Sequence, residues 1–470
     1  MPRILLITLF FIIVLFQIPG EKVPVNEGTY GHGLFFRQVA IEFVDVIDKD
    51  SYNIWQLQHI FPFALVHMVY VIFGLELEPE SLLSGMVILN FIFLGLAVFW
   101  FFRIMKKLHF EGAMEALAFV LLFFNFFLLK EVWYNPFSTD MAAFCLGLAQ
   151  VNYFIRYEKN KLFLSSFVGA FVSPFLLPIG LLLMVLPGDK LVIYEEEKPN
   201  SIISFAIVVF FAVLMLVLAY VTGRFEASWL LFLGFMVSLI TLLVFLYWVG
   251  RSSPINWSES WKIIGKKLHK ERILIFFGGL FVVSLLLWLL SGSNSNVSLV
   301  QLTQAFVGAL FRFPLDFLAG HLMFFGLIIP LSLVFLYRVL KETALLGIGF
   351  TLAMVILAVF ALHPNSGTIV PFLPLLFLGL MKAIRRYRVL WKDVWKIGIL
   401  NLILSMFWVR LNVPGLEEAF EKGERGGFPA QRYWMHFGDA QDLGVMVVVL
   451  GIFIGLLWLL EKGRRRYVRS

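Results

Sequence analysis

Long apolar runs separated by short polar connections dominate this chain of 470 residues. Most of the runs are continuous over about 15 to 22 residues, close to the length that an α-helix needs to cross a hydrocarbon core of about 30 Å. The alternating polar and apolar positions of a membrane β-strand do not occur. The pattern predicts an all-α, polytopic membrane protein with runs at 4–19, 57–74, 82–102, 113–129, 139–155, 162–187, 201–222, 228–249, 273–291, 320–337, 343–361, 367–381, 396–411 and 443–460.

Composition supports this class and narrows the chemistry. Hydrophobic residues make up 60% of the chain, charged residues 15%, and the mean hydropathy is +0.88, outside the range of soluble globular proteins. The single cysteine, Cys145, excludes a disulfide framework and a cysteine-based metal site. No nucleotide-binding or hydrolase signature occurs, and the scattered histidines form no evident metal site. A divalent cation is the one cofactor left open.

The run at 57–74 decides the topology. If it crossed the membrane, the basic clusters at 262–272, 382–392 and 462–469 would all lie outside, against the positive-inside rule. The piece from 60 to 74 is also only about 22 Å long as a helix, and it contains a proline and a histidine. We therefore expect 57–74 to lie on the outer surface without crossing.

With 162–187 read as two short arms bent at Ser173 and Pro174, the chain has about 14 membrane segments and both termini in the cytoplasm. The first run, 4–19, is then an uncleaved signal anchor. Of the 38 lysines and arginines 28 lie inside and 10 outside, and of the 31 acids 12 lie inside and 19 outside. The inside carries +16 (28 minus 12) and the outside −9 (10 minus 19). Anionic cytoplasmic lipid explains this basic charge, so no nucleic-acid partner is expected.

Two membrane modules follow, 1–190 and 191–470, with outer loops at 20–81, 292–319 and 412–442. Within the first loop, polar residues recur at spacings of 4, 3 and 4 opposite an apolar stripe, which predicts an amphipathic helix. We expect this helix and 60–74 to lie together in the headgroup layer. The polar positions are Gln38, Glu42, Asp45 and Lys49, and the apolar ones Phe35, Val39, Phe43 and Val46.

Three outer-face stretches carry a resemblance to a known family. They are Tyr30-Gly31-His32-Gly33-Leu34-Phe35-Phe36-Arg37, Gln58-His59-Ile60-Phe61-Pro62 and Tyr134-Asn135-Pro136-Phe137-Ser138-Thr139-Asp140. Placed after a first span and between later spans, they resemble the GT-C superfamily, whose members are integral-membrane glycosyltransferases that use polyprenyl-phosphate-linked sugars. The resemblance covers about residues 1–190, and the remainder matches in hydropathy alone.

The resemblance implies a site on the outer loops. In the family an acid of the first loop acts as general base or orients the acceptor, and here His32 stands at its position, while His59 stands where an arginine is common. Asp140 keeps a family-like position. Catalytic roles are therefore expected for His32 and Asp140, since neutral histidine can accept a proton. Substrate-binding roles are expected for Arg37, His59, Tyr134 and Asn135.

Two further residues on outer loops, His363 and Arg432, are candidates for binding a phosphate, because arginine in particular suits phosphate geometry. Structural roles compete at each position. His32 could be a turn residue, Arg37 an interface anchor, and Asp140 the cap of a membrane helix. Each of these alternatives stays open in the sequence.

The sequence thus predicts an inverting glycosyltransferase of a bacterial inner membrane that moves a sugar from a polyprenyl-phosphate carrier to an extracytoplasmic acceptor. Its expected partners are the lipid-linked sugar and membrane lipid. Two alternatives remain: a non-catalytic GT-C-like scaffold of an envelope glycan complex, favoured by His32 in place of the acid, and a lipid-linked glycan transporter or polymerase.

Overall fold

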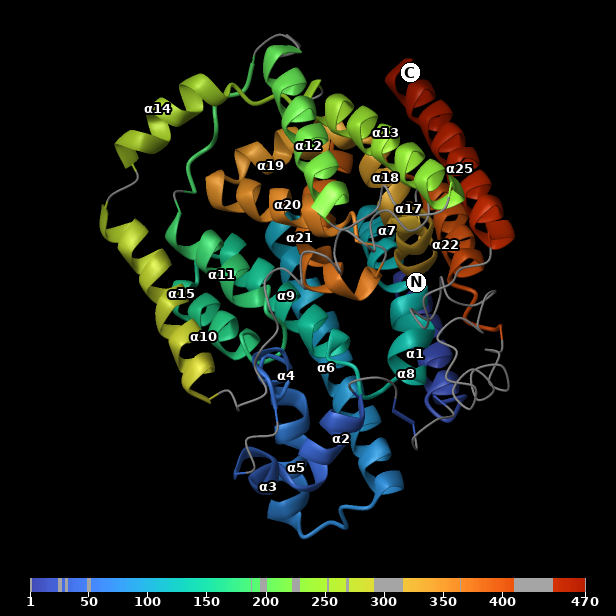
Figure 1. Cartoon of the computed structure of the whole chain (residues 1–470). Helices are drawn as coiled ribbons and strands as arrows, with labels where there is room; N and C mark the ends of the chain where they lie inside the picture. Colours follow the sequence, from blue (N-terminus) through green and yellow to red (C-terminus); the bar gives the residue numbers. More distant parts are fainter. Residues whose placement is uncertain are drawn as a thin grey trace.

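The computed structural model describes residues 2–23, 28–29, 33–48, 52–186, 188–194, 201–221, 229–251, 253–267, 270–290, 316–363, 365–409 and 443–469. Over these ranges every named element is a helix, and the one β-bridge joins Ile193 to Ile255. Apolar helices of membrane-spanning length occur among them. The prediction of an all-α membrane protein is confirmed at this level (Figure 1).

The helices of the first 190 residues are α1 (Pro2–Gln17), α2 (Gly33–Ile41), α3 (Phe43–Asp48), α4 (Ile54–Leu57), α5 (Phe61–Phe73), α6 (Pro79–Leu108), α7 (Gly112–Phe123), η1 (Phe127–Glu131), α8 (Val132–Tyr134), α9 (Asp140–Ile155), α10 (Lys159–Gly169) and α11 (Leu176–Val185). Those that follow are α12 (Ser201–Val221), α13 (Trp229–Arg251), α14 (Trp257–Lys267), α15 (Lys270–Leu290), α17 (Asp316–Phe325), α18 (Ile328–Val334), α19 (Leu336–Leu345), α20 (Ile348–Phe360), η3 (Ser366–Phe372), α21 (Leu373–Ile384), α22 (Trp391–Ser405) and α25 (Leu443–Arg469).

Four helical stretches in the described ranges are long and apolar enough to cross a membrane: Pro79–Leu108, Phe232–Arg251, Lys270–Leu290 and Ser366–Ile384. Two bent pairs, α7 with η1–α8 and α17 with α18, bring the number to six if each pair is one span. Shorter apolar helices include α1, α5, α9, α11 and α20. The count of about 14 segments therefore stays a prediction.

The first outer loop folds into a lobe of α2, α3, α4 and α5 beside the start of α6, at the lower end of the view in Figure 1. The single amphipathic helix expected here is instead two helices that meet at Glu42. Backbone bonds from Glu42 N to Gln38 O (2.8 Å) and from Val46 N to Glu42 O (2.9 Å) bridge the break, so the pair acts as one bent helix.

The predicted faces of this bent helix are largely confirmed. Val39 and Val46 are buried, while Gln38, Glu42 and Asp45 are exposed. One detail differs, because Phe35 was expected on the buried face and its neighbour Phe36 takes that place. Phe36 is buried and Phe35 only half-buried, because Phe36 stacks on Phe63 of α5 with ring centroids 4.4 Å apart. Stacking of this kind adds to the free energy gained by burial, so α2 is fixed against α5.

The run at 162–187 forms the two short arms expected of it. The first arm, α10, ends at Gly169 and the second, α11, begins at Leu176. In the turn between them, the Phe171 carbonyl accepts a hydrogen bond from the backbone N–H of Phe61 at 3.0 Å. This bond fixes the start of α5 at the turn between α10 and α11. The other ends of the two arms are Lys159 and Val185.

Two of the predicted continuous runs are broken in the structure. In 113–129, the chain bends by 61° at Asn125, whose side chain donates to Leu122 O (2.8 Å) and accepts from Leu128 N (3.0 Å). In 320–337, it bends by 117° at Gly326, which has φ +64°. The helix end left open there is satisfied by Asn401 of α22, whose Oδ1 accepts from Leu327 N at 2.8 Å. Apolar surroundings require such partners for backbone groups.

Candidate functional site

Asp140, the one acid at a family-like position, is the first residue of α9 and follows a tight turn after α8. The turn is anchored from α6, because the amide of Asn90 donates to Pro136 O at 3.0 Å within the core. The backbone N–H of Asp140 is bound by Ser138 Oγ at 3.1 Å, so the Asp140 carboxylate does not cap its own N–H. The Asp140 side chain also hydrogen-bonds with Ser138 and lines the neighbouring pocket.

That pocket brings a second acid, Glu131, to Asp140. It is narrow and is lined by Asn90, Phe127, Glu131, Val132, Asn135, Ser138, Asp140 and Met141. Glu131 is buried, its Oε2 has no hydrogen-bond partner among the described residues, and its charge is close enough to interact with that of Asp140. Neither carboxylate pairs with a described cation. Each acid has a hydrogen bond, Glu131 with Asn135 and Asp140 with Ser138. Placing two acids side by side with one buried oxygen left unbonded still costs free energy.

Two lysines lie where the segment after α1 meets the end of α8. Lys130 forms an ion pair with Glu21 at 3.3 Å, and the half-buried Lys22 lies near enough to be repelled by Lys130. Partial burial and then this repulsion lower the pKa of Lys22 to about 8. The segment is held in place by the bond from Val23 N to Tyr134 O at 3.0 Å. This positive charge lies near Tyr134, which also interacts with Glu131.

The start of η3 lies beside Asp140 on another side. Asn365 caps η3 by accepting from Gly367 N at 2.9 Å, and a Cβ on Gly367 would lie 3.4 Å from Asp140 Oδ2. The half-buried His363 accepts from Asn365 N at 3.1 Å, and burial lowers the pKa of His363. The glycine at 367 therefore leaves room beside the Asp140 carboxylate. His363 lies four residues earlier in the chain.

His321 of α17 bonds both to the end of α20 and to the start of η3. Its Nδ1 is 2.8 Å from Ser366 Oγ and its Nε2 is 2.8 Å from the Ala361 carbonyl. A neutral imidazole with its proton on Nε2 satisfies both bonds, since it then donates to the carbonyl and accepts from the hydroxyl. His321 is buried in α17 and fixes both ends of the turn that reaches Asp140.

The first outer loop reaches the same place through an aromatic stack. Phe137, in the turn before Asp140, lies parallel to Phe63 with centroids 6.2 Å apart, and Phe63 stacks on Phe36 of α2. At the start of α2, a Cβ on Gly33 would lie 3.8 Å from the Cβ of Phe137. The residue before Gly33, His32, lies outside the described residues, so its predicted meeting with Asp140 stays a prediction.

The predicted residues thus fall into three groups. Asn135 and Asp140 line one pocket with Glu131, and Tyr134 lies near Glu131. His363 lies four residues before Gly367, which reaches Asp140. Arg37 and His59 lie in the outer lobe, where His59 packs on Trp55 with centroids 4.2 Å apart. Arg432, like His32, lies outside the described residues.

Sequence reasoning missed Glu131, Lys130, Glu21 and His321. A signal existed for three of them, because Lys130 and Glu131 interrupt the end of an apolar run and His321 lies within one. Ionisable residues inside membrane segments are functional candidates by default. In the described ranges, no group of three His, Cys, Asp or Glu residues could hold a metal ion. Glu131 and Asp140 together supply two carboxyl groups, one fewer than such a group.

Taken together, the apolar helices and a buried polar site at their ends define an integral membrane protein of the all-α class. Comparisons with protein-family models, with curated proteins and with solved structures found no match.

Proposed function

We propose that this protein is a GT-C-like glycosyltransferase that moves a sugar from a polyprenyl-phosphate carrier to an acceptor on the outer side of a membrane, such as a bacterial inner membrane. The observation that carries the proposal is the pair of neighbouring carboxyl groups, buried Glu131 and half-buried Asp140, neither of which forms an ion pair in the described chain. Neighbouring acids without a cation at the edge of a membrane domain are candidates for a site that a substrate completes.

The chemistry assigned to the pair is an inverting displacement. The acceptor hydroxyl attacks C1 of the donor sugar, the bond between C1 and the phosphate oxygen breaks, and the lipid phosphate leaves with that electron pair. Asp140 accepts the hydroxyl proton, and Glu131 lies beside it as the second acid of the pocket. His32, next to Gly33, is the second candidate base.

The donor phosphate has matching groups nearby. A polyprenyl tail stays in the bilayer, so its phosphate lies at the headgroup plane where the apolar helices end. Lys130 is paired with Glu21 and lies near Lys22, and Tyr134 lies between this group and Glu131, since it interacts with both Glu21 and Glu131. Ammonium groups bind phosphate as point charges, and both lysines would stabilise the leaving phosphate as negative charge develops on it.

The pocket between the acids is too narrow to admit a water-sized sphere. Substrate entry therefore requires a movement, and the start of η3 at Gly367 and the turn of Phe137 are two segments next to Asp140 that could supply it. A scaffold with no substrate would have no need of such a movement. The closed pocket is the observation that favours the scaffold reading, and activity measurements separate the two.

The test replaces Asp140 with asparagine and follows sugar transfer in membranes supplied with polyprenyl-phosphate-linked hexoses and pentoses. If Asp140 takes the proton, Asp140→Asn lowers turnover by about 10²-fold to 10⁴-fold with normal protein levels. If it only starts a helix, asparagine serves nearly as well and turnover is unchanged.

The matched control is Asp393→Asn. Asp393 also lies in the first turn of an apolar helix, α22, where its carboxylate binds Leu390 N at 3.1 Å. This variant should keep wild-type transfer. Full activity in both variants would refute the catalytic assignment and support the scaffold.

A further inference from the structure

A second cluster of charged side chains lies at the other end of the rod formed by η3 and α21. Glu342 of α19 is largely buried and forms ion pairs with two cations, Arg386 at 3.1 Å and Lys382 at 3.8 Å. Lys382 is in turn repelled by Arg385 and by Lys190. Three separate segments thus contribute four cations and one acid to one place.

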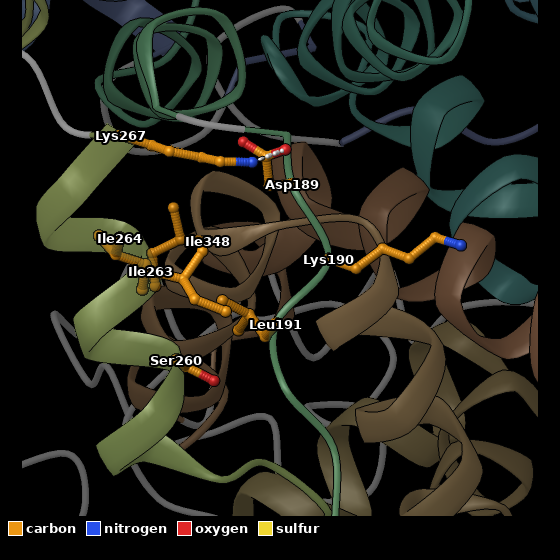
Figure 2. A pocket seen from close by; sticks show the side chains of 8 residues that line it. All are labelled: Asp189, Lys190, Leu191, Ser260, Ile263, Ile264, Lys267 and Ile348. Carbon is orange, nitrogen blue, oxygen red and sulfur yellow. Dashed lines mark hydrogen bonds and ion pairs between the residues drawn. The ribbon is translucent and has the colours of Figure 1, made fainter.

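Lys190 is brought there by an extended segment. Within 188–194, the backbone N–H of Leu191 bonds to Ala344 O at 3.0 Å, which ties the segment to the end of α19. Figure 2 shows that Asp189 faces α14, where it pairs with Lys267 at 2.7 Å, and that Lys190 points to the opposite side. Successive side chains of an extended chain alternate in this way. Asp189 is therefore directed away from the cluster.

The charges in this cluster do not balance. Lys190, Lys382, Arg385 and Arg386 contribute +4 at neutral pH, and Glu342 contributes −1. The C-terminus of α21 adds about −0.5 through its dipole. About 2.5 positive charges remain, and no ion pair reaches Lys190 or Arg385 from the rest of the described chain. Capping a helix end would need one cation, so the excess indicates an anionic ligand.

The position of the cluster indicates where that ligand comes from. Ser366–Ile384 is one of the four helices long enough to cross a membrane, and Lys382 and Arg385 mark its C-terminal end. The Arg385 guanidinium lies over the ring of Phe110, 6.0 Å from its centroid, which holds it at the end of the helix. Lipid headgroups surround such a helix end.

We propose that Lys190, Lys382 and Arg385 bind the phosphate group of an anionic phospholipid. The site is independent of the proposed sugar transfer. Gly367, which touches Asp140, and Lys382 are separated along one helical rod by a distance on the order of 25 Å. A bound phosphate neutralises the repulsion within the cluster and links α19, α21 and the 188–194 segment.

The experiment measures the unfolding temperature of the full-length protein in detergent with added phosphatidylglycerol, phosphatidylcholine or inorganic phosphate. The test variant is Lys190→Gln/Arg385→Gln. The control is Lys262→Gln/Lys266→Gln, which removes the same charge from α14, a helix tied to the same segment through Lys267 and Asp189. Neither test residue forms an ion pair in the described chain, so the test variant loses no internal contact of that kind.

The expected results have opposite signs in the two lipids. With phosphatidylcholine the test variant should unfold at or above the wild-type temperature, because repulsion is relieved. With phosphatidylglycerol the wild type should gain stability, and the test variant should need at least about tenfold more lipid for half the gain. The control should respond as the wild type does.

Protection by inorganic phosphate alone, lost in the test variant, would support the same site with a soluble phosphate as its source. Equal protection of wild type and test variant by phosphatidylglycerol would overturn the proposal. So would an equal loss in test and control variants, because that result reports total charge and not this cluster.

Discussion

Asn90 fixes the turn that presents Asp140, and its replacement tests how far the site depends on that turn. Asn90→Ala leaves the buried carbonyl of Pro136 without its donor. The expected cost is about 1 to 3 kcal/mol in the free energy of unfolding. Denaturation of the purified protein in mixed micelles measures it. In the same variant, the proposed sugar transfer should fall by a larger factor than the amount of folded protein. Unchanged stability would show that the Pro136 carbonyl finds another partner.

Glu158 should make the stability of the folded protein depend on pH in the acid range. Its carboxylate is bound first by Lys161 and then by Arg156, each at 2.7 Å, and these bonds lower its pKa from 4.5 to about 2. A depressed carboxyl pKa stabilises the folded state above pH 4.5, and this stabilisation is lost as the pH falls from about 4.5 to about 2.

The wild-type unfolding temperature should therefore fall more steeply between pH 5 and pH 3 than that of Glu158→Gln, which has no proton to bind. Thermal scans of both proteins at half-unit steps of pH make the comparison. Parallel curves would show that Glu158 has an ordinary pKa in the folded protein.

At the level of residues, sequence reasoning placed Asp140 at the start of an apolar helix, as the structure has it, but it did not single out Glu131. The reason is that Glu131 follows an apolar run and looks like the first residue of a polar loop. Only the π-helical turn of η1 directs it back into the core, next to Asp140. That turn arises from Asn125, whose side chain replaces backbone bonds, and such a replacement has no periodic signal.

Close helix packing makes a prediction for two glycines. A Cβ on Gly349 of α20 would lie 2.1 Å from the backbone oxygen of Leu182 in α11, whereas a Cβ on Gly95 of α6 meets nothing within 4 Å. Gly349→Ala should cost about 1 to 3 kcal/mol or more, because a backbone atom must move. Gly95→Ala should be neutral or gain about 0.5 to 1 kcal/mol, since alanine favours a helix.

The amount of monodisperse protein recovered after heating in detergent compares the two variants. Equal recovery of both would mean that α20 can slide along α11 without loss. Sequence alone places both glycines in apolar runs and cannot separate them, because the obstacle at Gly349 comes from a helix more than 160 positions earlier.

Element by element, the lengths of most apolar runs were well predicted, and their continuity was not. The run at 139–155 is α9 almost residue for residue, and 162–187 is the expected pair of arms. The runs at 113–129 and 320–337 break at Asn125 and Gly326. Hydropathy averages over a window, so a single residue that stops a helix is invisible when its partner, such as Asn401, is distant in sequence.

For the whole molecule, the distribution of charge predicts that α5 does not cross the membrane and that both termini are cytoplasmic. With Cys145 replaced by alanine, single cysteines at Glu21 and Glu78 should both react with a membrane-impermeant maleimide from the outside. Glu111, beyond the far end of the 30-residue α6, should react only after permeabilisation. Protection of the Glu78 position in intact cells would invert the topology from α6 onward.

The junction of Gly326 and Asn401 has a consequence for tracing this protein's ancestry. Asn401 joins two broken helices, since it accepts from Leu327 N and donates to Val120 O at 3.1 Å, and any side chain on Gly326 would strike it at 2.6 Å. An aspartate lacks the donor and a leucine lacks both groups. Diverged descendants of the same ancestor should therefore retain this glycine and this asparagine together, even after the surrounding apolar residues have drifted beyond alignment.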